Sequence, residues 1–152
     1  MRWQRSSIVA VLAASSSIVL AVGCGGDANK SADELVRDSV VSWYSAVARG
    51  DGAKACALMT EAGRRRDLAG GDSVVESSGQ VHAAPTSCEA QVKAAGRKLA
   101  LAGLAAQVGA VMVRGVRVLD DRATVTTEFA QRRQTLVLRR VAGRWLVDGA
   151  PS

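Results

Sequence analysis

The stretch VMVRGVRVLDDRATVTTEFAQRRQTLVLRRVAGRWLVD, residues 111–148, decides the fold of this protein. Its side chains alternate with a period of two, which is typical of half-buried strands, and one predicted face consists of Ala123, Val125, Thr127 and Phe129. Turn residues interrupt the alternation at 120–121, 131–133 and 142–143, and Gly115 permits a bulge in the first strand. The stretch therefore predicts an antiparallel meander of about four strands.

Three helices are predicted ahead of this meander. The first opens at the capping box Ser31-Ala32-Asp33-Glu34 and ends at Gly50, with one apolar face made of Val36, Val40, Trp43, Tyr44 and Val47. The second begins at Asp51, and we expect Gly63 and the arginines at 64–66 to end or fray it. The third begins near Thr86 or Ser87 and extends toward Ala106. This order predicts an α+β fold, with the helices on one face of a curved sheet.

The first 23 residues have the pattern of a secretory signal peptide. Arg2 and Arg5 precede an apolar stretch from Ile8 to Val22, and no acidic residue comes before Asp27. A membrane-spanning anchor is the alternative. However, the stretch of 15 residues would span only about 22 Å as a helix, and the hydrocarbon core is ~30 Å thick.

The end of this segment, Leu20-Ala21-Val22-Gly23-Cys24, resembles the lipobox of bacterial lipoproteins, with the leucine one position earlier than usual. The resemblance implies that Cys24 receives a diacylglyceryl group, that cleavage precedes it, and that the protein is anchored at the extracytoplasmic face of the cell membrane. Two or more acyl chains hold a protein on a bilayer stably. An ordinary secretory cleavage that leaves Cys24 free is the alternative. Residues 24–30 then form a flexible, glycine-rich tether.

Cys56 and Cys88 are the two cysteines that remain when Cys24 carries lipid. In an oxidising compartment a disulfide between them is the expected state, and it would stabilise the fold by roughly 3–4 kcal/mol. Two buried free thiols are the alternative. A nucleophilic cysteine would need His82, the single histidine, which lies in the polar segment Gly70–Pro85 without a supporting Asn or Asp pattern. We expect that segment to be a loop, and the sequence leaves its role open.

The composition excludes several kinds of binding protein. Three Trp, one Tyr and one Phe are too few for a stacking platform on single-stranded nucleic acid. One histidine excludes a multi-histidine metal site, and we expect no cofactor. The net charge of +6 comes largely from arginines grouped at 64–66, 132–133 and 139–140, with Arg144 nearby. These either contact anionic lipid headgroups or wall polymers, or form a solvated face that discourages aggregation, and we favour the second interpretation.

The order of these elements is similar to that of a known group. The similarity rests on residues 43–51 leading into 55–60, on the second cysteine before Glu89, and on residues 116–125 and 136–147. Together they resemble small extracytoplasmic lipoproteins of high-GC Gram-positive bacteria with a nuclear-transport-factor-2-like fold, also called SnoaL-like or cystatin-like. The resemblance covers nearly all of Ser31 to Ala150. It implies one domain over residues 31–152, a cone-shaped cavity between helices and sheet, and a disulfide from the second helix to the third.

Enzymes of this fold place a carboxylate and a phenol in the cone. Here the only phenol is Tyr44, and we expect the candidate acids Glu128 and Asp148 to point away from the cavity. We therefore predict a non-catalytic binding or scaffolding lipoprotein at the cell envelope. Its expected partners are the membrane, through Cys24, and an envelope protein or an apolar ligand.

Two other functions remain as alternatives. One is the binding of an apolar small molecule or lipid in the cone; the less favoured is an isomerase-like enzyme. The residues that either fill the core or line such a pocket are Trp43, Tyr44, Met59, Phe129 and Trp145.

Overall fold

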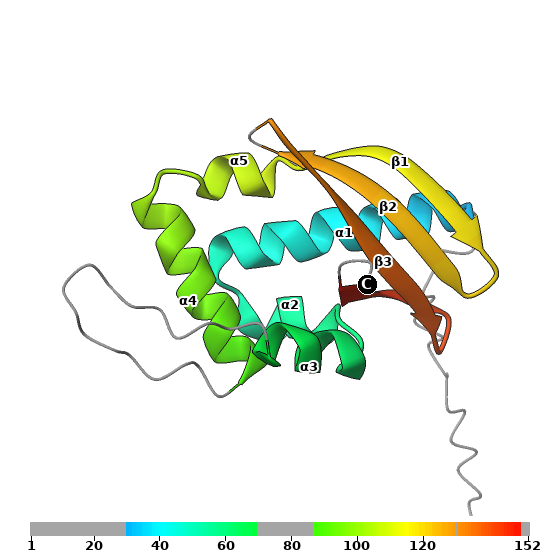
Figure 1. The fold of residues 1–152 in the computed structure, drawn as a ribbon, viewed down its shortest axis with the longest axis horizontal. Helices are drawn as coiled ribbons and strands as arrows, with labels where there is room; N and C mark the ends of the chain where they lie inside the picture. The colour runs from blue at the N-terminus through cyan, green and yellow to red at the C-terminus, as the bar shows by residue number, and fades with distance from the viewer. Residues whose placement is uncertain (1–29, 70–86, 130, 150–152) are drawn as a thin grey trace, which may run out of the picture.

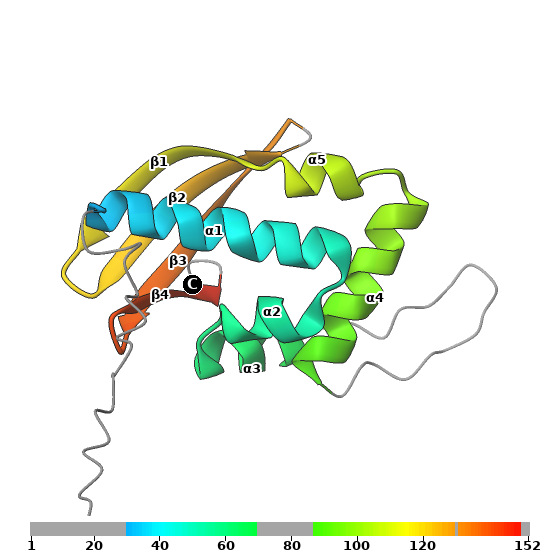
Figure 2. The same ribbon diagram turned by 180° about the vertical axis from the view of Figure 1, so that it is seen from behind.

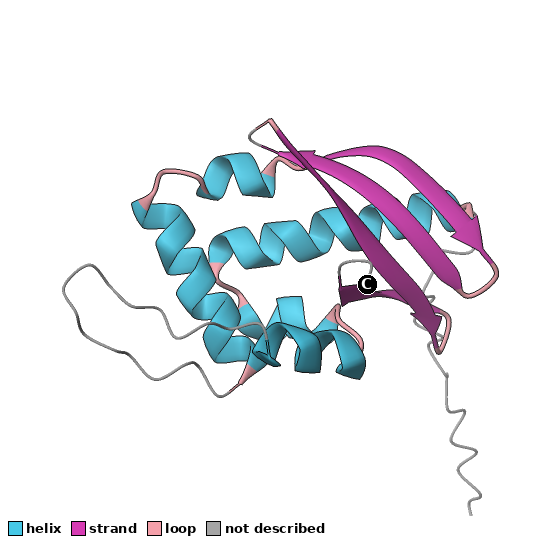
Figure 3. Ribbon diagram, in the orientation of Figure 1, coloured by secondary structure: helices cyan, strands magenta, loops and turns pink. Residues whose placement is uncertain are grey.

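The computed structural model describes residues 30–69, 87–129 and 131–149 (Figure 1). Its elements are α1 (Ala32–Arg49), α2 (Gly52–Ala57), α3 (Glu61–Ala69), α4 (Cys88–Leu101), α5 (Ala105–Gly109), β1 (Met112–Leu119), β2 (Arg122–Phe129), β3 (Arg132–Val141) and β4 (Arg144–Gly149). The predicted α+β class is confirmed, with the helices ahead of the sheet (Figure 3). The predicted signal peptide, Cys24, the tether up to residue 29 and the loop Gly70–Pro85 lie outside the described residues.

The four strands form one antiparallel sheet in the order β1-β2-β3-β4, which is the predicted meander. The register of β1 against β2 shifts between Val113 and Gly115, so the expected bulge is present. Ala123, Val125 and Thr127 of β2 are fully buried, which confirms the alternation read from the sequence. They lie on the inner face of the sheet, toward the helices.

Helix α1 crosses this inner face, as the two opposite views in Figures 1 and 2 show. Its N-terminus is the predicted capping box, with the Ser31 side chain accepting from the Glu34 backbone and the Glu34 carboxylate accepting from the Ser31 backbone. Val36 and Val40 are fully buried against the sheet. The Arg37 guanidinium also donates to the backbone oxygen of Val113 over 3.1 Å, which ties α1 to β1.

The prediction that Gly63 and the arginines at 64–66 end the second helix is wrong. Helix α2 ends at Ala57, and a separate helix, α3, runs through these residues. The Thr60 hydroxyl accepts from the Gly63 N–H over 2.9 Å at the start of α3. A Cβ at Gly63 would lie 2.8 Å from the backbone oxygen of Val147, so this glycine allows α3 to approach β4 closely.

The third predicted helix is also shorter than expected. Helix α4 begins after the cap Ser87, as predicted, but ends at Leu101 rather than near Ala106. Gly103 has a φ of +67°, a left-handed conformation that ends a helix, and the short α5 follows. The described part of the chain thus has five helices where three were predicted.

A disulfide joins Cys56 of α2 to Cys88, the first residue of α4, over a Cα–Cα distance of 6.1 Å. This confirms the predicted pair. Around it lies a second apolar cluster, separate from the main core, made of Ala46, Ala55, Cys56 and Val92. No helix within the described ranges is long and apolar enough to cross a membrane.

Candidate functional site

The five candidate pocket residues lie together in or beside the main core. Tyr44, Met59 and Trp145 are each 3% exposed, and Trp43 and Phe129 pack against them from the edge. The Tyr44 ring is the centre of the group. Its centroid lies 5.0 Å from that of Trp43 in an edge-on contact and 5.7 Å from that of Phe129.

The hydroxyl of Tyr44 is bound by two strands of the sheet. It shares a hydrogen bond of 3.0 Å with the Thr127 hydroxyl, and the Gln134 side-chain amide donates to it. Burial raises the pKa of Tyr44 above its usual value of 10.0, so this phenol is neutral at physiological pH. None of its hydrogen-bond partners is a carboxylate.

The carboxylate of Asp148 lies in a different environment, beside α3. It accepts from the Thr60 hydroxyl over 2.5 Å, and its Oδ2 lies 3.6 Å from the guanidinium of Arg66 and 3.4 Å from that of Arg139. Its side chain is 8% exposed. The expectation that Asp148 points away from the cone agrees with these partners. Its burial was missed, because α3 was not recognised as a helix that packs on β4.

Glu128 is on the outer face of the sheet, the face turned away from α1. The Arg114 guanidinium donates two hydrogen bonds to it, over 3.2 and 3.3 Å, and Arg133 lies 3.5 Å away. The hydrogen bonds from Arg114 lower the pKa of Glu128. With Gly115 and Thr126, these three charged residues line a shallow hollow on the sheet.

A groove of about 220 Å³ runs between α1 and the turn from β3 to β4. It is lined by Leu35, Asp38, Ser39, Ser42, Leu58, Gly143, Arg144 and Trp145. Trp145 is the one predicted pocket residue among them. The indole N–H of Trp145 is buried and has no acceptor among the described residues, and the same is true of Trp43. The groove is smaller than the ~300–1,000 Å³ pockets that hold drug-sized ligands.

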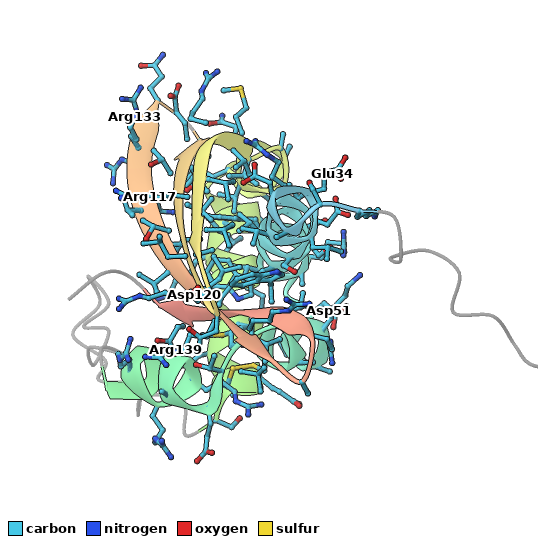
Figure 4. All side chains as sticks on the ribbon, turned by 90° about the vertical axis from the view of Figure 1, so that its right-hand side faces the viewer. Glu34, Asp51, Arg117, Asp120, Arg133 and Arg139 are labelled. Atoms are coloured by element: carbon cyan, nitrogen blue, oxygen red, sulfur yellow. A yellow bond between two sulfur atoms is a disulfide. The ribbon has the colours of Figure 1, made fainter. Side chains whose placement is uncertain are left out.

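Several arginines gather on one side of the molecule. Arg117, Arg133 and Arg139 project from the sheet on the side away from α1, whereas Glu34 and Asp51 lie on the α1 side (Figure 4). In the described ranges, no group of three or more His, Cys, Asp or Glu side chains is placed to hold a metal ion. Comparison of the chain with protein-family models, with curated proteins and with solved structures finds no match.

Proposed function

We propose that the chain is a lipoprotein of the cell envelope, anchored by lipid on Cys24, whose residues 31–152 form a nuclear-transport-factor-2-like domain outside the cytoplasm. The domain binds or scaffolds at the membrane surface without catalysis. Its address comes from the sequence: the cationic start, the apolar stretch and the lipobox-like residues 20–24.

The observation that carries the proposal is the disulfide between Cys56 and Cys88. Structural disulfides persist in oxidising compartments and are rare in the cytosol. The export signal proposed from the sequence and the disulfide both favour a protein that folds outside the cytoplasm. Cys24 is then the one cysteine outside the bond, which suits a role in lipid attachment.

The fold-family part of the proposal is supported by the order of elements. Helices precede a four-stranded meander, and α1 lies across the inner face of the sheet. The interior that a cone would enclose contains the buried side chains of Tyr44, Met59 and Trp145. In this arrangement these side chains contribute to the core of a binding or scaffolding domain.

The contacts of the polar side chains support the non-catalytic role. Acid–base chemistry in a cone needs a carboxylate within reach of the phenol. The hydroxyl of Tyr44 instead binds Thr127 and Gln134, and Asp148 binds Thr60 on the other side of β4. The phenol of Tyr44 and the carboxylate of Asp148 therefore lie in two separate environments.

The groove beside Trp145 favours a second candidate function, the binding of a small apolar ligand. Leu35, Leu58 and Trp145 contribute apolar side chains to its lining. Native mass spectrometry of the purified protein separates the two functions. A co-purified small molecule favours the groove, and a mass without added ligand favours the scaffold.

Cell fractionation tests the anchoring. The wild-type protein, produced in a bacterium that processes lipoproteins, is expected to partition with membranes and into the detergent-rich phase of a phase separation. The Cys24→Ser variant is expected to accumulate as precursor or to be released. Leu101→Ser is the control, because that position is 90% exposed and the change leaves both the lipid site and the disulfide intact. Membrane retention of Cys24→Ser equal to wild type would contradict the proposal.

A further inference from the structure

We propose that the outer face of the sheet docks on the anionic bilayer to which the chain is anchored, so that the domain lies on the membrane with α1 turned away from it. The inference rests on the proposed lipid anchor for its geometry, and on the charge of the described residues for its chemistry. The docking surface consists of Arg114, Arg117, Arg122, Arg133 and Arg139, and is called the arginine face below.

The pairing register places these five arginines on one face. Arg117 is opposite Thr124, and Arg122 is opposite Arg139. Thr124 and Arg122 alternate with the buried residues of β2, so these positions lie on the outer face. Arg114 and Arg133 reach the same face, because both bind Glu128 there. The face thus spans the three strands β1, β2 and β3.

Acids offset part of the charge of this face, including Asp120 and Asp121 in the turn between β1 and β2. Glu128 is shared between Arg114 and Arg133, and Asp148 is buried beside Thr60 and α3. Arg117 and Arg122 take part in none of the ion pairs found in the described part of the chain. A cluster of arginines with this excess of charge is the surface that phosphate headgroups attract.

The α1 side of the domain carries acids and bases in near balance. Asp33 and Asp38 of α1 are paired with Arg37 and Lys30, and Lys54 follows the cap Asp51 in α2. Glu34 and Asp51 are on the far side of the molecule from Arg117 and Arg133 (Figure 4). An anionic surface therefore attracts the sheet more strongly than the α1 side, which favours one orientation.

The chain between Cys24 and the domain is long enough for this orientation. The seven residues 24–30 reach at most about 25 Å when extended. Helix α1 and the sheet are each about 10 Å thick, so the path from Ser31 around the sheet edge to its outer face is about 20 Å. A bilayer close to the anchor is thus within reach, which favours it over a soluble polyanion as the partner.

Orientation on vesicles tests the proposal. The acylated protein is extracted from membranes and reconstituted into phosphatidylglycerol or phosphatidylcholine vesicles. A fluorophore is attached at Thr124→Cys on the arginine face, or at Val41→Cys on α1. Val41 is 42% exposed. Acrylamide, a neutral aqueous quencher, then reports which face is covered. Leu119→Cys, at a position 61% exposed on the same face, replaces Thr124→Cys if that variant does not fold.

The expected result is reduced quenching at Thr124→Cys in phosphatidylglycerol vesicles only, with no change at Val41→Cys. One arginine near an anionic surface contributes about fivefold to binding, the equivalent of about 1 kcal/mol. The Arg117→Gln/Arg122→Gln variant should thus lower the ratio of docked to undocked protein by about 25-fold. The matched control is Arg97→Gln/Lys98→Gln, which removes two exposed charges from α4 and should leave the ratio unchanged.

Four outcomes would contradict the docking. They are equal quenching in both lipids, an equal loss in the α4 control, protection by soluble polyphosphate without protection by vesicles, and protein that floats with neither vesicle. The anchor is read separately by flotation. Protein that floats with phosphatidylglycerol alone lacks the anchor but keeps the arginine face, whereas protein that floats with both and is quenched equally keeps only the anchor.

Discussion

Removal of the Cys56–Cys88 bond should destabilise the domain strongly, because the bond closes a loop of 32 residues between α2 and α4. In the chain-entropy model a loop of this length contributes about 3–4 kcal/mol to the free energy of unfolding. A domain of this size loses ~3–5 °C of melting temperature per kcal/mol, so the expected fall is about 10–20 °C. The loss of about 3–4 kcal/mol is a large fraction of the 5–15 kcal/mol that typically stabilises a domain.

Thermal unfolding of the Cys56→Ala/Cys88→Ala variant, followed by circular dichroism, measures this fall. Alanine is the chosen replacement because Cys56 is 5% exposed among Ala46, Ala55 and Val92. The hydroxyl of a serine would be buried there among apolar side chains. Reduction of the wild-type protein should lower the melting temperature by a similar amount. Cys24→Ser is the control and should melt like wild type. An unchanged transition in the double variant, or alkylation of both thiols in untreated protein, would refute the reasoning.

Three further predictions concern single positions. Asp148→Asn should lower the free energy of unfolding by about 2 kcal/mol in chemical denaturation, because it weakens the contacts of a buried carboxylate with two half-exposed arginines. Glu61→Gln, in a surface ion pair, should lower it by under about 0.5 kcal/mol, and equal losses would contradict this. Gly96→Ala should cost about 1–3 kcal/mol, since its Cβ would lie 2.5 Å from the Gly50 backbone, and Gly115→Ala, which meets nothing within 4 Å, should cost less. Tyr44 has a raised pKa, so its contribution to stability is complete below pH 10.0 and is lost above it; an ultraviolet titration showing ionisation at the ordinary pKa of 10.0 would be the contrary result.

The elements predicted well are those whose signals are local. The alternation in β2 and the capping box at Ser31 each depend on residues a few positions apart, and both are present in the structure. The bulge near Gly115 likewise follows from a break in the alternation. The pairing of Cys56 with Cys88 followed from having only two candidates left once Cys24 was assigned to lipid.

The predictions that failed depended on contacts between distant residues. Gly63 and the arginines after it resemble a helix end, but α3 is held by β4, with the Arg66 guanidinium donating to the backbone oxygen of Asp148 over 2.8 Å. Those residues are 82 positions apart, and no local pattern announces the contact. The burial of Asp148 has the same cause. Thr60 caps α3 and binds Asp148. As a typical N-cap residue, it was the one residue whose type could have suggested the start of α3 and a partner for Asp148.

The mass of the N-terminal peptide of the mature protein tests the central claim most directly. The proposal predicts a peptide that begins at Cys24, lacks residues 1–23 and carries a diacylglyceryl group on sulfur. A peptide that begins at Met1, with a free thiol on Cys24, would contradict it.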